Sequence, residues 1–240
     1  MNLAGKTVLV TGGTAGIGEQ IALQLKAKGA SVIVTGRSET GLAKARDAGF
    51  DAIAANLSSP DGAQAIVDAL GGRAIDVLIN NAGQGVDHDF RQGAPDIAAA
   101  DDCIYANLNS PIRLIAALLD GLKARPEAAI VNVTSGLAIA PNTGSAVYCA
   151  TKAGLRSYTM SLRAQLAGTK VHVIEALPPV VETQMTARLT GKKLSPQECA
   201  RQIVEAIERD RDEASVGQVK LLQAIYSVSP AFARRFMLKF

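Results

Sequence analysis

Short apolar runs alternate with longer amphipathic stretches along most of this chain. The runs are rich in Val, Ile, Leu and Ala, and each is bounded by glycine, proline or polar residues. We expect them to form buried parallel strands, because a strand that is covered on both faces needs no polar alternation. They lie at residues 6–10, 31–35, 51–55, 75–79, 128–133 and 170–176. A further run at 214–220 is expected to add an edge strand.

Segments with helical character fill the intervals between these runs. They lie at residues 19–29, 40–48, 60–70, from 95 onward, around 148 and at 195–209. The clearest helix start has Ser195 as a cap, Pro196 at the first helical position and Glu198 at the third. Alternating strands and helices predict an α/β fold, in which a doubly wound parallel sheet is covered by helices on both faces.

Composition excludes several classes of protein. The chain has 240 residues, of which 48% are hydrophobic and 20% charged, and we expect one domain over residues 1–240. A net charge of +3 with scattered basic residues argues against a nucleic-acid-binding surface. The absence of a signal peptide and of a membrane-spanning run favours a cytoplasmic protein. Cys103, Cys149 and Cys199 are widely spaced, so we expect neither a disulfide framework nor a metal site.

A glycine-rich turn follows the first apolar run directly. Residues 11–18 are Thr-Gly-Gly-Thr-Ala-Gly-Ile-Gly, and an amphipathic segment follows from residue 19. Glycine lets the backbone approach phosphate groups closely, and a helix N-terminus offers unpaired N–H groups and a positive dipole end. A strand, a glycine turn and a helix in this order predict a site for the pyrophosphate of a dinucleotide. The alternative is a tight turn that binds no ligand.

The end of the second apolar run indicates which dinucleotide is bound. In dinucleotide-binding folds an acidic residue at this point contacts the ribose diol of NAD, whereas a nearby arginine accommodates the 2′-phosphate of NADP. This chain has Gly36 there, followed by Arg37. NADP(H) is therefore favoured, and NAD(H) stays possible if Arg37 is only a solvated loop charge.

Tyr148 and Lys152 are the leading candidates for catalytic chemistry. Residues at i and i+4 share one face of a helix, so a phenol and an ammonium would project side by side. An ammonium about 4 Å away, at an effective dielectric of about 20, would lower the pKa of the phenol by about three units. Ser135 follows the run 128–133 and would add a hydroxyl at the carboxyl edge of the sheet. By itself, Tyr-x-x-x-Lys also occurs by chance on solvated helices.

These motifs, taken together and in this order, resemble the short-chain dehydrogenase/reductase family. The resemblance covers about residues 5 to 190 and rests on the glycine turn, the segment Asn80-Asn81-Ala82-Gly83, Ser135 and the pair Tyr148 and Lys152. It implies a Rossmann fold with a seven-stranded sheet in the order 3-2-1-4-5-6-7. It also implies a homodimer or homotetramer.

The resemblance implies roles for individual side chains. Tyr148 would exchange a proton with the substrate oxygen, and Ser135 would polarise that oxygen. Lys152 would lower the tyrosine pKa and anchor the nicotinamide ribose, while Asn107 would support proton resupply. The positions implied to bind the cofactor are Gly12, Thr14, Gly16, Ile17, Gly18, Arg37, Asn56, Leu57, Asn81, Ala82, Gly83, Tyr148, Lys152, Pro178, Val181 and Thr183.

Two positions depart from the family pattern. Asn56 stands where an aspartate usually contacts the adenine, so its side-chain carbonyl would have to serve instead. Pro179 replaces the glycine of Pro-Gly-x-Val-x-Thr, and because proline fixes φ the backbone must be extended there. Thr183 still fits the pattern. Residues 182–193 would form a mobile substrate lid, with Gly191 as a candidate hinge.

The implied function is an oxidoreductase that transfers a hydride between nicotinamide and a carbonyl or alcohol substrate, with carbonyl reduction by NADPH favoured. One alternative is a nucleotide-sensing or scaffold protein, which would need the glycine turn but not Ser135, Tyr148 and Lys152 together. Another is a membrane-surface enzyme acting on a lipid-like substrate, because residues 221–240 mix apolar and basic side chains in an amphipathic segment. Packing of this tail against the protein is the first expectation.

Overall fold

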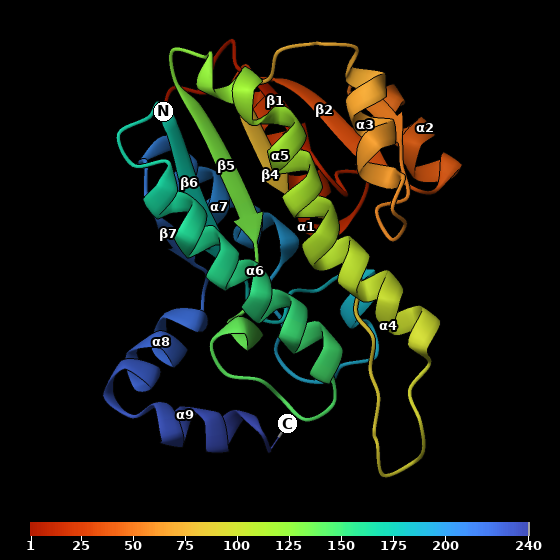
Figure 1. The fold of residues 1–240 in the computed structure, drawn as a ribbon, viewed down its shortest axis with the longest axis vertical. Coiled ribbons are helices and arrows are strands. Elements are labelled where there is room, and N and C mark those ends of the chain that lie inside the picture. Colours follow the sequence, from red (N-terminus) through yellow and green to blue (C-terminus); the bar gives the residue numbers. More distant parts are fainter. Residues whose placement is uncertain (240) are drawn as a thin grey trace.

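Seven parallel strands form one sheet in the order β3-β2-β1-β4-β5-β6-β7 (Figure 1). The structure is a computed structural model that describes residues 1–239. The strands are β1 (Thr7–Val10), β2 (Ser31–Gly36), β3 (Asp51–Ala54), β4 (Val77–Asn80), β5 (Ala128–Val133), β6 (Val171–Leu177) and β7 (Glu213–Ser215). The predicted α/β class and strand order are confirmed. The order reverses between β1 and β4, where ligands bind in sheets of this type.

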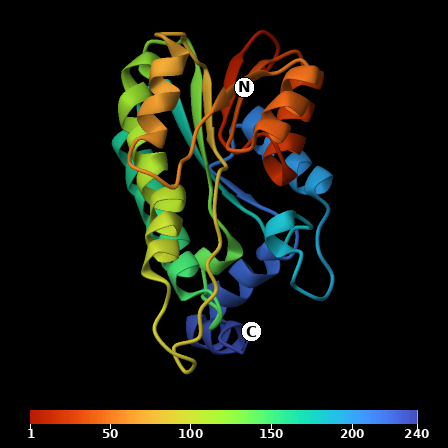
Figure 2. The ribbon, with the colours of Figure 1, turned by 90° about the vertical axis from the view of Figure 1, so that its right-hand side faces the viewer.

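Helices cover both faces of the sheet (Figure 2). One layer consists of α1 (Gly16–Ala27), α2 (Glu39–Asp47) and α7 (Pro196–Glu208), and the other of α3 (Gly62–Leu70), α5 (Ser110–Lys123) and α6 (Ala146–Gln165). Successive strand residues enter opposite cores, as Val8 and Val10 do on one side and Leu9 on the other. This two-sided burial explains why the apolar runs lack polar alternation.

The connection between β4 and α5 contains the helix expected from residue 95 onward and, after it, a π-helical segment that the sequence did not predict. Helix α4 (Ile97–Ile104) begins two residues after Pro95, with Asp96 as its cap. It continues into a π-helical segment, η1 (Tyr105–Asn109), before α5 starts. Segments of this kind often occur at functional sites. Among residues 1–239, no helix combines the length and the apolar character that crossing a membrane requires.

The C-terminal part differs most from expectation. Strand β7 ends at Ser215 and does not extend through 214–220, because Gly217 takes a φ of 54° and turns the chain into α8 (Val219–Val228). The tail then forms a second helix, α9 (Pro230–Met237). The two helices break at Ser229, since Pro230 has no N–H to continue α8, and the serine hydroxyl caps the new helix.

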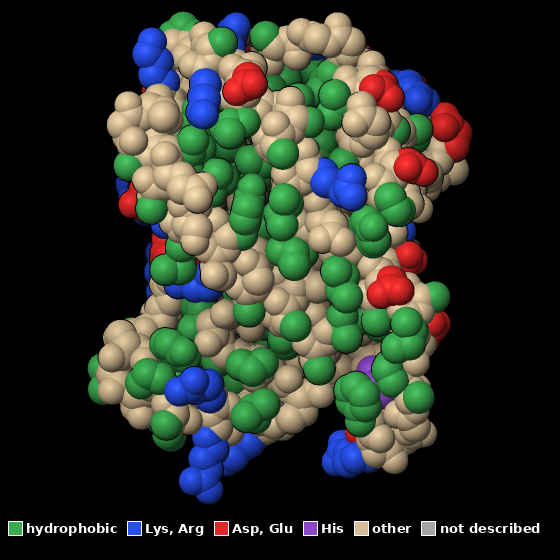
Figure 3. Space-filling view, viewed as in Figure 1, with side chains coloured by type: hydrophobic (Ala, Val, Ile, Leu, Met, Phe, Trp, Pro, Cys, Tyr) green, Lys and Arg blue, Asp and Glu red, His purple; other side chains and the backbone are tan. Residues whose placement is uncertain are grey.

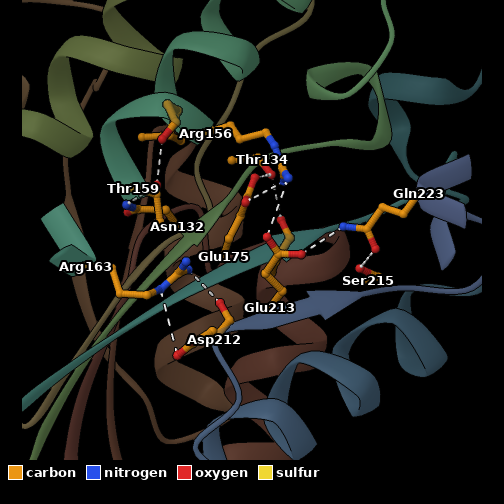
Figure 4. A network of polar contacts seen from close by, with 12 residues as sticks. Asn132, Thr134, Arg156, Thr159, Arg163, Glu175, Asp212, Glu213, Ser215 and Gln223 are labelled. Atoms are coloured by element: carbon orange, nitrogen blue, oxygen red, sulfur yellow. Dashed lines mark hydrogen bonds and ion pairs between the residues drawn. The ribbon is translucent and has the colours of Figure 1, made fainter. Parts of the chain in front are cut away.

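A buried polar network ties the edge of the sheet to α6 (Figure 4). Glu175 on β6 is fully buried, and its carboxylate accepts hydrogen bonds from Thr134 Oγ1 at 2.7 Å and Arg156 Nη1 at 2.6 Å. Arg156 also lies 3.5 Å from Glu213 on β7. Burial raises the pKa of Glu175, whereas the bonds from Thr134 and Arg156 oppose that increase. The network therefore connects β5, β6, β7 and α6 through one carboxylate.

The same network extends to the C-terminal helices. Gln223 on α8 donates to Glu213 at 2.9 Å and accepts a bond from Ser215. Arg163 on α6 donates to the carbonyl oxygens of Val173 and Asp212, each at 2.7 Å. Helix α8 is thus held against the last strand by side chains as well as by apolar packing.

We predict that Arg156→Met lowers the free energy of unfolding by about 3 kcal/mol, because it leaves the Glu175 carboxylate buried without its cation. Urea denaturation at neutral pH measures the loss. Adding Glu175→Gln should recover part of it, since a neutral amide keeps a partner for Thr134. Arg201→Met is the matched control: its ion pairs on α7 are exposed, so its cost should stay below about 1 kcal/mol. Equal losses in the two single variants would contradict the prediction.

Candidate active site

The glycine turn lies between β1 and α1. Helix α1 begins at Gly16, and Ala15 before it makes no side-chain cap, so the first helical N–H groups are left for other acceptors. A Cβ on Gly18 would lie 2.3 Å from the carbonyl oxygen of Gly12, so the turn closes too tightly for any side chain there. Ile17 packs against the core beneath. This cradle of N–H groups suits an anionic phosphate.

The exit of β4 holds the glycine turn in place. Thr11 Oγ1 accepts hydrogen bonds from the backbone N–H groups of Asn81 and Ala82, both at 3.0 Å. Asn81 Nδ2 donates to the carbonyl oxygens of Thr11 at 3.0 Å and Gly12 at 3.3 Å. The side chain of Asn81 therefore fixes the turn.

At the end of β2, Thr14 occupies the space that a side chain on residue 36 would need. A Cβ on Gly36 would lie 2.5 Å from Thr14 Oγ1. An acidic residue would therefore displace Thr14. Arg37 is exposed, and its Nη1 donates to Gln84 Oε1 at 3.2 Å. The Ser58 hydroxyl donates to the same oxygen at 3.2 Å, so a guanidinium and a hydroxyl meet near the ends of β2 and β3.

The turn after β3 differs in detail from expectation. We expected Asn56 to offer its side-chain carbonyl to a ligand, but this oxygen accepts the N–H of Ser58 at 3.2 Å and closes an Asx turn. Leu57 is buried, and its backbone carbonyl accepts the hydroxyl of Ser110 at 2.7 Å. The side-chain NH₂ group of Asn56, which is exposed, is then the part of this side chain that can donate to a ligand.

Ser135, Tyr148 and Lys152 come together where β5 ends and α6 begins. Lys152 is buried, and its Nζ donates to the carbonyl oxygen of Val133 at 2.8 Å. The same nitrogen lies 5.7 Å from the centre of the Tyr148 ring. Ser135 hydrogen-bonds the Tyr148 phenol, and its Oγ accepts the N–H of Leu137 at 3.1 Å. The three side chains that the sequence suggested for proton transfer are therefore neighbours.

Burial controls the protonation of this group. It raises the pKa of Tyr148 to about 12, and the bond from Ser135 opposes the increase only in part. Burial also lowers the pKa of Lys152 to about 8. That Lys152 lowers the tyrosine pKa stays a prediction: here its ammonium donates to a backbone carbonyl, and desolvation is the largest influence on the pKa of the phenol. At pH 7 the phenol is neutral and most of the lysine is charged.

Asn107 lies fully buried in η1, and its carboxamide is occupied by the chain itself. Its Oδ1 accepts the N–H of Gln84 at 2.8 Å, and its Nδ2 donates to the carbonyl of Gln84 at 2.8 Å and to Thr151 Oγ1 at 3.1 Å. A Cβ on Gly83 would lie 3.1 Å from this Oδ1 and 3.5 Å from Lys152 Nζ. Asn107 therefore fixes the loop after β4 beside the lysine.

The segment after β6 returns to the same edge of the sheet. The carbonyl oxygen of Pro178 accepts the N–H of Gly136 at 2.9 Å, which joins this segment to the one after Ser135. Val181 is buried and forms a β-bridge with Leu194. Residues 182–193 are thereby closed at their base into a loop.

That loop reaches back over the glycine turn. A Cβ on Gly16 would lie 3.2 Å from the methyl group of Thr183, so the two ends of the predicted cofactor site meet. Within the loop, the short helix η3 (Gln184–Thr186) brings Met185 close to Gly85: a Cβ there would lie 3.8 Å from Met185 Sδ. The predicted lid therefore starts over the site, and its mobility stays a prediction.

The arrangement fits a dinucleotide. An uncapped helix N-terminus, glycines that leave room for a backbone approach, and an exposed arginine follow one another along the carboxyl ends of β1, β2 and β4. Among residues 1–239, no three His, Cys, Asp or Glu side chains gather as metal ligands would. A cavity of about 350 Å³ lies between α6 and α8, where Ile139, Arg156 and Tyr226 contribute to its walls, and none of the predicted site residues lines it.

Gln84 is the main site residue that sequence reasoning missed. It joins Arg37, Ser58 and Asn107, three positions far apart in the chain. Only its place directly after Gly83 could have drawn attention to it. Thr11 was likewise included in the glycine turn without a role of its own.

Comparisons with known proteins agree with this geometry. The short chain dehydrogenase family profile matches residues 6–194. An uncharacterized oxidoreductase of Bacillus subtilis, DltE, is 37% identical over 93% of this chain and 92% of its own length. The 3-oxoacyl-[acyl-carrier-protein] reductase FabG of Vibrio cholerae is 36% identical over 80% of each chain. A Burkholderia cenocepacia short chain dehydrogenase crystallised with NADP superposes with a TM-score of 0.89 at 24% identity, over 99% of both chains.

Proposed function

The chain belongs to the short-chain dehydrogenase/reductase family of NAD(P)-dependent oxidoreductases, and we propose that its reaction is the reduction of a substrate carbonyl by NADPH. The observation that carries the proposal is the meeting of Ser135, Tyr148 and Lys152 beside the glycine turn. The Vibrio cholerae relative, named as a 3-oxoacyl reductase, supports a carbonyl as the reacting group.

The residues proposed to hold the cofactor form a continuous line. The N–H groups of the turn and of α1 would bind the pyrophosphate, and Arg37 the 2′-phosphate. Asn56 and Leu57 would border the adenine, while Val181, Thr183 and the Pro178 backbone would face the carboxamide end. When bound, the reduced nicotinamide supplies the hydride.

Tyr148 is proposed to donate the proton that the carbonyl oxygen gains. The raised pKa keeps the phenol protonated at pH 7, which is the form that a proton donor needs. Ser135 would donate a hydrogen bond to the same oxygen and so stabilise the charge that develops on it. The Lys152 ammonium would oppose the negative charge left on Tyr148 and anchor the ribose.

Asn107 is proposed as a positioning residue. Its carboxamide is already bonded to Gln84 and Thr151, the latter next to Lys152 in sequence. Its proposed support of proton resupply is to hold the loop after β4 in place beside Lys152. The hydrogen bonds of Asn107 would keep Lys152 in a fixed position.

The non-catalytic alternative is less well supported. A nucleotide sensor needs the glycine turn but gains nothing from a buried lysine beside a tyrosine, because burial of that amine is unfavourable. We also propose a homodimer or homotetramer, formed in part by α6, where Ala150 and Ala153 are exposed small residues that allow close helix packing.

Tyr148→Phe should reduce kcat for carbonyl reduction by at least about 100-fold, because the proton donor is removed while the ring stays. NADPH oxidation over a carbonyl panel measures the change, and isothermal titration calorimetry tests that NADPH still binds. Tyr158→Phe, the same substitution further along α6, is the control and should alter kcat by less than about twofold. A loss below about tenfold in Tyr148→Phe would rule out the proposed donor.

Reduction should slow as the pH rises through about 8, because Lys152 has a lowered pKa and loses its positive charge there. Tyr148 keeps its proton over this interval, since its pKa is about 12. Initial rates from about pH 6 to about pH 10 give the profile. In Lys152→Arg the charge persists, so the rate should be lower overall but without a fall near pH 8. A wild-type rate that is flat through pH 9 would contradict this.

Arg37→Ser should raise the KM for NADPH by about tenfold or more, because a charged hydrogen bond to the 2′-phosphate is lost. The KM for NADH should stay within about twofold, since NADH has no such phosphate. The control is Arg46→Ser, on the exposed side of α2, where Arg46 pairs only with exposed Glu39 in the described contacts. Equal increases for both cofactors would exclude a role in selecting NADPH.

A further inference from the structure

Helices α8 and α9 and the loop between β4 and α4 lie at the same end of the molecule. Both ribbon views place them together, below the carboxyl ends of the strands (Figures 1 and 2). The predicted catalytic residues face this end too, since Ser135 follows β5. One end of the protein therefore combines the site with its most projecting segments.

The charged side chains of the segment that forms α8 and α9 are all positive. Residues 219–239 contain Lys220, Arg234, Arg235 and Lys239 and no aspartate or glutamate, and all four cations are exposed. Removing these four from the 25 basic residues leaves 21 against 22 acidic residues. The excess positive charge of the chain thus resides in this segment.

Large apolar side chains accompany these cations. Val228 is 87% exposed, Leu221 64% and Phe232 58%, and the rings of Phe232 and Phe236 stack with centres 6.3 Å apart. Figure 3 shows Lys and Arg side chains projecting from this lower edge beside apolar ones. A basic and apolar surface of this kind is typical of a segment that lies in a membrane interface.

The inner side of the pair α8 and α9 already packs and hydrogen-bonds within the protein. Val219 and Leu222 pack near Gly136, and Gln223 bonds to β7. Arg234 lies over the ring of Tyr226, 5.9 Å from its centre, which joins α9 to α8. The exposed residues therefore belong to a second face that looks away from the protein.

The loop before α4 adds a second apolar contact point at this end. Phe90 is 68% exposed and lies beside His88, while Arg91 is bonded to Asp89. Of the other acidic side chains of the loop, Asp87 accepts a bond from Ser145 and Asp96 accepts the N–H of Ala99 as the cap of α4. The acidic groups here are thus engaged within the protein, and the apolar ring is what the loop presents.

We propose that the outer face of α8 and α9, together with Phe90, docks this protein on an anionic lipid bilayer. The charge favours lipid over a second copy of the chain, because a symmetric dimer through this face would bring together two segments whose charged side chains are all positive. Docking in this orientation turns the catalytic end toward the bilayer, which suits a substrate with an apolar chain. The docking is independent of the proposed reaction and is tested by binding alone.

Vesicle flotation with the full chain tests the proposal. Wild type should float with phosphatidylcholine vesicles that contain about 30% phosphatidylglycerol, at least tenfold more than with phosphatidylcholine alone, and raised salt should weaken this binding. Arg235→Glu with Lys239→Glu should reduce it at least tenfold, and Phe232→Ser should reduce it as well. Circular dichroism confirms that each variant is folded.

Lys123→Glu with Lys170→Glu is the matched control, because both residues are exposed and lie at the opposite end of the strands. It makes the same change in net charge and should bind within about twofold of wild type. No flotation of wild type, equal flotation with both lipids, or equal losses in the two charge variants would overturn the proposal. So would sedimentation showing that Arg235→Glu with Lys239→Glu instead dissociates an oligomer. Retained NADPH oxidation in a non-floating variant separates this outcome from failure of the proposed reaction.

Discussion

The hydrogen bond from the Lys152 ammonium to the Val133 carbonyl is the contact on which the site depends. It holds α6 against the end of β5 at 2.8 Å, and this places Tyr148, one turn earlier, next to Ser135. A charge in this position has lost most of its hydration, which is why the pKa of the lysine falls to about 8. The fold tolerates that cost because a carbonyl oxygen replaces part of the lost water.

A second buried charge, the Glu175 carboxylate, stabilises the same region of the fold as Lys152. Thr134 lies between Val133 and Ser135, and its hydroxyl is bonded to Glu175. Glu175 is bonded in turn to Arg156, one helical turn after Lys152. Both ends of the β5–α6 connection are therefore attached to the same carboxylate. A shift of the serine relative to the tyrosine would have to disturb this ion pair.

The sequence was sufficient for the fold and for the outline of the site. Buried strands and the glycine turn have local signatures, because they depend on residues that are adjacent in the chain. The π-helical segment around Asn107, the Asx turn at Asn56 and the links made by Gln84 depend on partners far away in sequence. The rise in the pKa of Tyr148 that burial causes could not be predicted either, since spacing along a helix reports proximity but not desolvation.

The bridge between Val181 and Leu194 separates the loop at 182–193 from the sheet that carries it. A loop whose two ends are joined can change in length at small entropic cost, since closure depends only weakly on the number of residues. Its ends would stay attached to β6 and α7 whatever the segment between them contains. Evolution could therefore exchange this segment and alter which molecules are admitted, while the proton-transfer residues keep their places.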